Sequence, residues 1–288
     1  MRYPAPITRT RDSLGFWLPI LGNALLTLVL GYLVLGPPGM LYLPLLYAFY
    51  LYLGKRISME GLLRFYRARP LRPEELPRLH AANVELSRRA GLARPPRLFY
   101  VPHQMLNAFA LGDRHGTGVA LTYGLLQRLT ERELIGVLGH EIAHIHNGDI
   151  DTNRYLLAGR QLIGAFQLMG QLLLYYNLYL TVFRGYTVYL ELMLLLLAAP
   201  FFSVLLQFAF SRRREYAADL TGAYLAQDPE GLIDALQHIH RYQQYGLPEL
   251  NRDGRRAWYA RWLTTHPPLE QRVRRLRDYA RAALVENV

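Results

Sequence analysis

The stretch TERELIGVLGHEIAHIHNGDID, residues 130–151, combines the start of a helix with two closely spaced histidines. Thr130 and Glu133 have the form of a capping box, in which two side chains satisfy free backbone groups at a helix start. Apolar residues follow at helical spacing, so we expect a helix that begins directly after Thr130 and continues for roughly fifteen residues. His140 and His144 stand four residues apart on this helix, which places both imidazoles on one face, one turn apart. This spacing suits two ligands of one zinc ion.

Glu141 follows the first of these histidines directly. In this position a carboxylate can take a proton from a water molecule that zinc activates, and can later deliver it to the leaving amine of a cleaved peptide. Two histidines on an ordinary surface helix are the alternative interpretation, and the capped, amphipathic helix argues against it. The chain contains no Cys, which excludes disulfides and thiolate metal sites. Any metal must therefore be bound by His and carboxylate side chains.

A catalytic zinc site needs a third protein ligand and keeps one position open. The candidates are the remaining His residues and a carboxylate. Glu215 and Asp219 stand four residues apart, so on a helix one can bind the metal while the other holds a ligand His. Acidic pairs with this spacing also occur on solvated helix faces. The pattern alone therefore leaves the third ligand open.

Composition and hydropathy predict a membrane protein with a soluble part. Hydrophobic residues make up 51% of the 288 residues and charged residues only 19%, which is too apolar for a typical soluble globular protein. Residues 13–54 contain no charged residue, and Gly-Pro-Pro-Gly at 36–39 cannot continue a helix. We therefore expect two membrane-spanning helices, at about residues 16–35 and 40–54, joined by a tight turn.

A second apolar region covers about residues 161–211 and is interrupted only by Arg184 and Glu191. We expect a second membrane hairpin here, with its turn at residues 183–187. Gln and Asn side chains recur along the first half of this region, as on a buried or water-facing side. A helix pair that lies against the soluble domain is therefore the alternative.

Membrane topology explains most of the net charge of +11. Lys and Arg are concentrated before the first expected span, after the second and after the fourth, whereas the two outer turns contain only Arg184. By the positive-inside rule, both termini and the segment between the hairpins lie in the cytoplasm. The lipid bilayer is therefore an expected partner, and nucleic acid is not. The first apolar stretch is longer than the core of a signal peptide, so we expect it to stay uncleaved.

The expected fold is mainly α: a multi-pass α-helical membrane protein with two hairpins and a cytoplasmic α+β domain. Three short strand-like runs, at residues 97–101, 106–111 and 118–123, predict a small β-meander in that domain. The predicted parts of the chain are residues 1–54 (N-terminal segment and first transmembrane hairpin), 55–154 (first part of the catalytic domain, with an edge strand and the metal helix), 155–211 (second transmembrane hairpin) and 212–288 (second part of the catalytic domain).

Four motifs make this interpretation more specific: GHEIAHIHNGDID at 139–151, NAFALG at 107–112, EYAAD at 215–219 and HPPLEQRVRRL at 266–276. In this order, over nearly the whole chain, they resemble the HtpX family of membrane zinc metalloproteases, a relative of the CAAX prenyl proteases. The resemblance implies a gluzincin-type metallopeptidase domain, one zinc ion per chain and endopeptidase activity. It also implies a bacterial cytoplasmic-membrane enzyme whose active site faces the cytoplasm. Its substrates would be misfolded or damaged membrane proteins or other unfolded polypeptides, cleaved in quality control and stress response.

The resemblance also assigns roles to residues. It implies that Glu215 is the third zinc ligand and that Asp219 supports the site. The NAFALG strand corresponds to an edge against which a substrate peptide adds as an extra strand. The residues of that edge are Asn107, Ala108, Phe109 and Ala110. Leu111 departs from the pattern, because a smaller or polar residue is expected at its position.

His266 has two interpretations. Because two prolines follow it, it can be the start of the last helix, with Pro in the first turn. Alternatively, it reaches the active site, where it steadies the developing oxyanion or gates substrate entry, and Arg272 holds it or the flanking loop. Arg272 also belongs to a row of arginines that has the form of a solvated or lipid-facing basic side.

Two other functions share some of these features. A CAAX prenyl protease relative would use the same metal motifs, but four spans are too few to enclose the chamber of that family. A non-catalytic membrane scaffold or chaperone would use zinc only to stabilise its fold. A structural zinc site usually has four protein ligands, however, and gives no reason for Glu141 beside it. The sequence does not indicate an oligomeric state.

Overall fold

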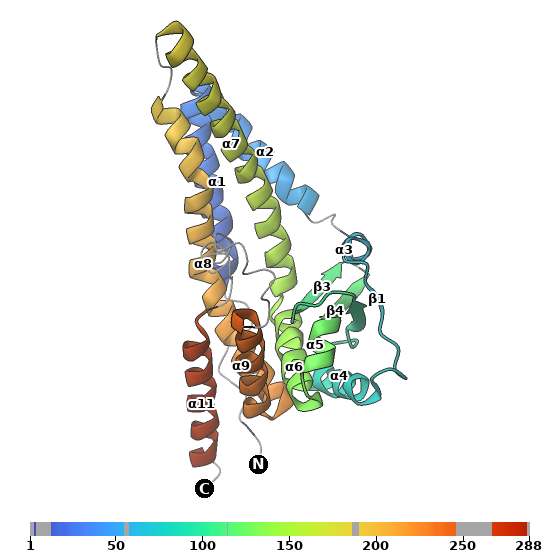
Figure 1. The fold of residues 1–288 in the computed structure, drawn as a ribbon. Helices are drawn as coiled ribbons and strands as arrows, with labels where there is room; N and C mark the ends of the chain where they lie inside the picture. The colour runs from blue at the N-terminus through green and yellow to red at the C-terminus, as the bar shows by residue number, and fades with distance from the viewer. Residues whose placement is uncertain are drawn as a thin grey trace. The chain divides into compact units, whose positions relative to one another are not determined.

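The computed structural model of the chain describes residues 3, 13–54, 58–113, 115–185, 190–245 and 267–286 (Figure 1). The described chain is mainly helical and contains one small sheet. It divides into two compact units. Unit 1 consists of Met1–Arg11, Ser58–Ile150 and Ser211–Val288, and unit 2 consists of Asp12–Ile57 and Asp151–Phe210.

The sheet of unit 1 has four strands in the order β1-β2-β4-β3. β1 (Arg69–Pro70) is antiparallel to β2 (Arg97–Val101), β2 is parallel to β4 (Gly116–Thr122), and β4 is antiparallel to β3 (Ala108–Asp113). The predicted meander is therefore wrong, because β4 lies between β2 and β3. This order leaves β3 at an edge of the sheet.

The connection from β2 to β3 crosses the end of β4, and Thr122 holds it there. The Thr122 hydroxyl donates to the Met105 carbonyl (2.6 Å) and accepts from the Asn107 N–H (3.0 Å). The Thr122 N–H donates to the Asn107 carbonyl (3.1 Å). These bonds carry the chain past β4 before β3 begins. Alternation of apolar residues shows which side chains face a core but not which strands are neighbours, so it could not reveal this crossing.

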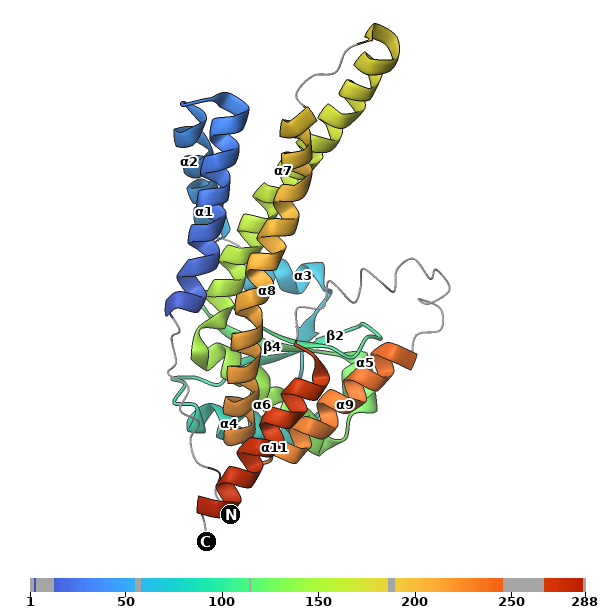
Figure 2. The ribbon, with the colours of Figure 1, turned by 90° about the vertical axis from the view of Figure 1, so that its left-hand side faces the viewer.

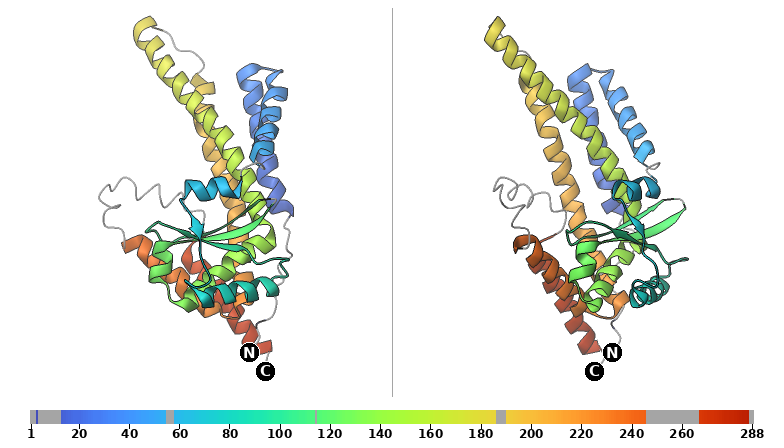
Figure 3. Two further views of the ribbon diagram at one scale, coloured as in Figure 1. Left: turned by 90° about the vertical axis from the view of Figure 1, so that its right-hand side faces the viewer. Right: turned by 45° about the vertical axis from the view of Figure 1, so that its right-hand side comes forward.

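Helices cover both faces of the sheet (Figure 3). α3 packs on one face through Met59 and Leu63, whereas α4, α5 and α6 build the main core on the opposite face around Leu121 and Leu138. The bounds of these helices are Met59–Phe65 for α3, Pro77–Arg89 for α4, Tyr123–Arg128 for α5 and Glu131–Asn147 for α6.

Two further helices pack against the C-terminal part of α8 (Leu190–Ala226). They are α9 (Pro229–Tyr245) and α11 (Leu269–Glu286), and Figure 2 shows both beside α8. Ala223, Leu232 and Leu276 form the centre of a separate apolar core among these three helices. This core fixes the last turns of α8 within unit 1.

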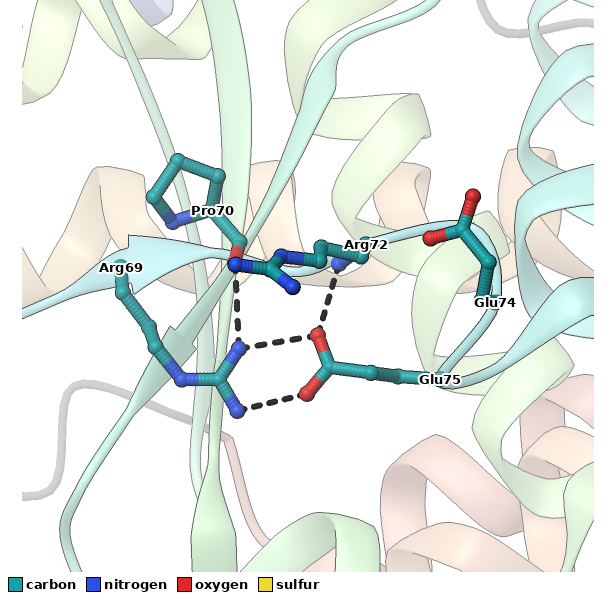
Figure 4. A pocket seen from close by; sticks show the side chains of 5 residues that line it. All are labelled: Arg69, Pro70, Arg72, Glu74 and Glu75. Carbon is teal, nitrogen blue, oxygen red and sulfur yellow. Dashed lines mark hydrogen bonds and ion pairs between the residues drawn. The ribbon is translucent and has the colours of Figure 1, made fainter.

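An exposed ion pair fastens the turn after β1 (Figure 4). The Arg69 guanidinium donates to both carboxylate oxygens of Glu75, at 2.9 and 2.6 Å. Glu75 also accepts from the Arg72 N–H at 2.8 Å. Both ends of the turn are thus tied to one carboxylate.

The helix that carries the two histidines is observed as expected. Thr130 and Glu133 form the predicted capping box: the Thr130 side chain accepts from the Glu133 N–H, and the Glu133 carboxylate accepts from the Thr130 N–H. α6 ends at Gly148, whose φ of 76° is in the left-handed region that favours glycine. The local signals in the sequence therefore define both ends of this helix.

Unit 2 contains the hairpin of α1 (Ser13–Leu35) and α2 (Gly39–Gly54), together with most of α7 (Asp149–Arg184) and the first part of α8. Gly31 and Gly39 allow α1 and α2 to approach closely, because a Cβ on either would collide with the backbone of the other. Within the described residues, none of the helices has both the length and the apolar character that crossing a membrane requires.

Candidate metal centre

Two glycines bring α6 and α8 into backbone contact next to the first histidine. A Cβ on Gly139 would lie 2.8 Å from the Gly222 carbonyl oxygen, and a Cβ on Gly222 would lie 2.7 Å from the His140 nitrogen. Only glycine fits such a close approach without a shift of the helices. The glycine pair therefore sets the distance at which His140 on α6 faces the acidic residues of α8.

We predict that Gly222→Ala separates α6 from α8 and weakens metal binding. The higher helix propensity of Ala contributes up to about 1 kcal/mol of stability, but overpacking against backbone costs about 1–3 kcal/mol or more. A lower unfolding temperature and a lower zinc content are expected from thermal unfolding and elemental analysis. Gly164→Ala is the matched control, because a Cβ on this helical glycine has no neighbour within 4 Å. Equal behaviour of the two variants would contradict the prediction.

Three side chains converge between these helices. His140 Nε2 and His144 Nε2 are 3.1 Å apart. Glu215 Oε2 lies 3.7 Å from His140 Nε2, and Glu215 Oε1 lies 3.6 Å from His144 Nε2. His140 and Glu215 are buried, and His144 is nearly so. The structure thus brings together the three residues that the sequence nominated as metal ligands.

The separations between these atoms fit a zinc ion. Zinc binds imidazole nitrogen and carboxylate oxygen at about 2.0–2.2 Å in tetrahedral geometry, so two of its ligand atoms lie about 3.4 Å apart. The observed separations of 3.1, 3.6 and 3.7 Å are close to this value. Among the described residues, the cluster contains no fourth protein ligand. Three ligands of this kind are the set that a catalytic zinc site uses.

Each histidine has a carboxylate at its other ring nitrogen. His144 Nδ1 is 2.7 Å from Asp149 Oδ2. His140 Nδ1 is 3.0 Å from Asp219 Oδ1, although the contact is poorly aligned for a hydrogen bond. A carboxylate at Nδ1 fixes the ring and its tautomer so that Nε2 points at the metal. Asp219 therefore lies where a supporting residue is expected.

Asp149 was not predicted, although it lies within the motif that contains the histidines. Gly148 turns the chain at the end of α6, so Asp149 returns beside the last turn of the helix and reaches His144. An acidic residue directly after a helix-ending glycine is the signal that could have identified it.

The carboxylates around His144 change its basicity. Burial lowers the pKa of His144, but the hydrogen bond to Asp149 and the charges of Glu215 and Glu141 outweigh burial and raise this pKa to about 9. At neutral pH the metal-free site therefore holds a proton on His144. An incoming metal ion must displace this proton, because only the neutral imidazole is a ligand.

Arg272 of α11 is buried beside the metal ligands. Its guanidinium donates to both oxygens of Asp219, at 2.7 and 2.6 Å, and its Nη2 lies 3.8 Å from Glu215 Oε2. Burial by itself raises the pKa of Asp219, but the charge and hydrogen bonds of Arg272 outweigh burial and lower it. The expectation of a solvated or lipid-facing side is wrong for Arg272. Arg272 donates its hydrogen bonds to Asp219, forms a longer ion pair with Glu215, and compensates the negative charge of the site.

We predict that Arg272→Met destabilises the protein by about 3–5 kcal/mol, because it leaves the buried Asp219 carboxylate without its cation. Thermal or denaturant unfolding measures this loss. The double variant Arg272→Met with Asp219→Asn should regain part of the stability, since it removes the uncompensated charge. Arg274→Met is the control, because Arg274 is exposed on the same helix and its loss should change stability by less than about 0.5 kcal/mol. Similar losses for Arg272→Met and Arg274→Met would contradict this assignment.

The remaining predicted site residues lie as follows. Glu141 is buried on α6, and its charge acts on both His144 and Arg272. Ala108, Phe109 and Ala110 are partly exposed on β3, and Asn107 is exposed just before it. β3 packs beside α6. His266 lies outside the described residues, so both interpretations of its role stay predictions.

Comparisons with known proteins point to one peptidase family. The sequence pattern of peptidase family M48 matches residues 73–280. Among similar curated proteins, a Protease HtpX homolog of Pyrococcus abyssi is 36% identical over 93% of this chain and 97% of its own. Another, of Aquifex aeolicus, is 33% identical over 89% of each chain. The crystal structure of S. mikatae Ste24p has a similar fold, with a TM-score of 0.53 and 19% identity; the match covers 92% of this chain and 64% of that one.

The matches to peptidase family M48 and to the HtpX homologs, over most of the chain, show that this protein is a metalloprotease. The extent of the matches shows that the chain belongs to peptidase family M48. The resemblance to the HtpX family inferred from the four motifs is confirmed.

Proposed function

We propose that this metalloprotease is a zinc-dependent endopeptidase of a bacterial cytoplasmic membrane, where it cleaves misfolded or damaged membrane proteins. The cluster of His140, His144 and Glu215, with Glu141 beside it, carries the proposal. When bound, zinc supplies a Lewis acid for the scissile carbonyl and makes a nearby water molecule more acidic. The three residues bind one ion, and Asp149 and Asp219 orient the two imidazoles.

Glu141 is the proposed general base. Its carboxylate takes a proton from the attacking water and returns it to the leaving amine of the cut peptide. Within the described part of the chain, no cation lies at hydrogen-bond distance from Glu141, so the carboxylate is not held in an ion pair. Its neighbour Arg272 is already bound to Asp219. This arrangement leaves Glu141 available for proton transfer.

The free edge of β3 is the proposed binding place for the substrate backbone. An extended peptide can add to such an edge by main-chain hydrogen bonds, which suits unfolded polypeptides of many sequences. β3 is one of the two outer strands of the sheet and packs beside α6, the helix that carries both histidines. Asn107, Ala108, Phe109 and Ala110 would form the contact.

Membrane integration is the other part of the proposal. It is supported by the uncharged residues 13–54 and by large apolar side chains that are exposed along all four helices of unit 2. Such side chains include Leu25 (63% exposed) on α1, Leu41 (60%) on α2, Tyr175 (67%) on α7 and Phe201 (56%) on α8. Exposed large apolar side chains in this number suit contact with lipid. The distribution of Lys and Arg favours a cytoplasmic site.

One experiment tests the proposal as a whole. The full chain is purified in detergent, its zinc content is measured, and cleavage of an unfolded membrane protein is followed before and after chelation. Cleavage should stop when zinc is removed and return when zinc is restored. Full zinc without cleavage would favour the scaffold interpretation, and cleavage restricted to a prenylated CAAX peptide would favour the prenyl protease interpretation.

A further inference from the structure

Large apolar side chains are exposed at the C-terminal end of α3, whereas most apolar side chains elsewhere in unit 1 are buried. Among the described residues of this unit, the large apolar side chains that are exposed are Phe65, Tyr66, Val84 and Met105. Phe65 is 79% exposed, more than any other such side chain in the described residues, and Tyr66 is 43% exposed. Val84 and Met105 each stand alone in the sequence among the exposed large apolar residues, whereas Phe65 and Tyr66 are adjacent.

Contacts with β3 fix the position of the two aromatic rings. Tyr66 packs on Phe109 of β3 with ring centroids 5.0 Å apart, and Phe65 meets Tyr66 edge to face at 5.1 Å. At the other end of α3, the fully buried Met59 donates its N–H to Asp113 at 3.0 Å. α3 is thus attached to β3 at both ends. The exposure of Phe65 is therefore a fixed feature of the fold.

Two arginines flank these rings. Arg64 and Arg67 are exposed, and neither has an ion-pair partner among the described residues. Arg69 is different, since Glu75 already binds its guanidinium (Figure 4). Glu60 stands four residues before Arg64 on α3, one helical turn away, but the described residues show no ion pair between the two. The exposed rings therefore stand in the chain between two arginines that form no ion pair within the described residues.

We propose that residues 64–67, the aromatic–basic edge, bind the headgroup region of an anionic lipid bilayer. The inference rests on the membrane part of the proposed function. Aromatic rings are favoured in the region between headgroups and acyl chains, and arginine finds phosphate oxygens there. An apolar polypeptide would cover the rings as well, but it would desolvate Arg64 and Arg67 without replacing their hydrogen bonds. A lipid bilayer provides apolar contact for the two rings and phosphate oxygens for the two arginines. Contact with the bilayer would hold β3 near the membrane surface.

The absence of Cys allows a direct test on the full chain. Phe65→Cys and, as the control, Val84→Cys on α4 (56% exposed) each receive a nitroxide spin label. The proteins are placed in lipid nanodiscs of phosphatidylcholine, with or without phosphatidylglycerol. Electron paramagnetic resonance then measures contact of the label with oxygen, which concentrates in lipid, and with a nickel chelate, which stays in water.

In discs with phosphatidylglycerol, the label at position 65 should be accessible to oxygen and shielded from nickel, and the label at 84 accessible to nickel. Adding Arg64→Gln and Arg67→Gln to Phe65→Cys should reduce this shielding. Nickel accessibility at 65 equal to that at 84 would overturn the proposal. Equal shielding without phosphatidylglycerol would overturn its anionic selectivity, and shielding only after addition of an unfolded polypeptide would identify a peptide site instead. Since the measurement requires no catalysis, its failure is distinguishable from a failure of the protease assay.

Discussion

Glu141→Gln is expected to abolish most peptide cleavage while zinc remains bound. The amide has nearly the size of the carboxylate but cannot accept the proton of the attacking water. General acid–base catalysis contributes about 10²–10⁴ in rate, so cleavage should slow by a factor in this range. Glu141 is not among the three side chains that converge as ligands, which is why the metal should stay.

The measurement compares zinc content and initial cleavage rates of the two proteins on the same unfolded substrate. Glu131→Gln is a suitable control, because Glu131 lies on the same helix but is exposed near its start. This variant should cleave at the rate of the original protein. Cleavage by Glu141→Gln within a few-fold of that rate would show that another group takes the proton.

The sequence predicted what depends on neighbours along the chain. The capping box at Thr130 and the spacing of His140 and His144 belong to one helix, so local rules were sufficient for them. The end of α1 and the start of α2 also follow from the Gly-Pro-Pro-Gly interruption. In each case a few adjacent residues contain the whole signal.

Features that depend on contacts between residues distant in the chain were harder to predict from the sequence. Glu215 was assigned largely through family resemblance, because its approach to the histidines depends on the contact between Gly139 and Gly222. In the sequence, each glycine by itself indicates only a position of low helix propensity. The order of the strands failed for a similar reason, since the bonds of Thr122 connect segments that no periodicity relates.

Arg272 shows how a pattern can mislead. The arginines of α11 were interpreted together as a basic side, but Arg272 stands four residues before the fully buried Leu276, on the face that packs against α8 and α9. An arginine can lie on a buried helix face if a carboxylate of a neighbouring element forms an ion pair with it. Asp219 supplies that carboxylate, and the sequence alone offered no means of pairing the two.

Glu215→Gln is expected to empty the metal site. Loss of a residue that only orients a ligand typically costs about 10–100-fold in metal affinity, so loss of a direct ligand should cost more than about 100-fold. Glu215 directs one oxygen at each histidine, and a neutral amide provides neither the charge nor the second oxygen. Zinc content after dialysis against a weak chelator measures the effect. Glu230→Gln, the same change at an exposed position of α9, should leave zinc content unchanged.

The two variants separate binding from chemistry. Glu141→Gln should retain zinc without cleavage, whereas Glu215→Gln should lose both, and excess zinc should restore some cleavage only to Glu215→Gln. Arg272 keeps its two hydrogen bonds to Asp219 in the Glu215→Gln protein, so the fold should persist, as circular dichroism can verify. A folded Glu215→Gln protein with full zinc would mean that the third ligand is another residue. His266 would then be the first alternative, because it stands within the HPPLEQRVRRL motif of the family.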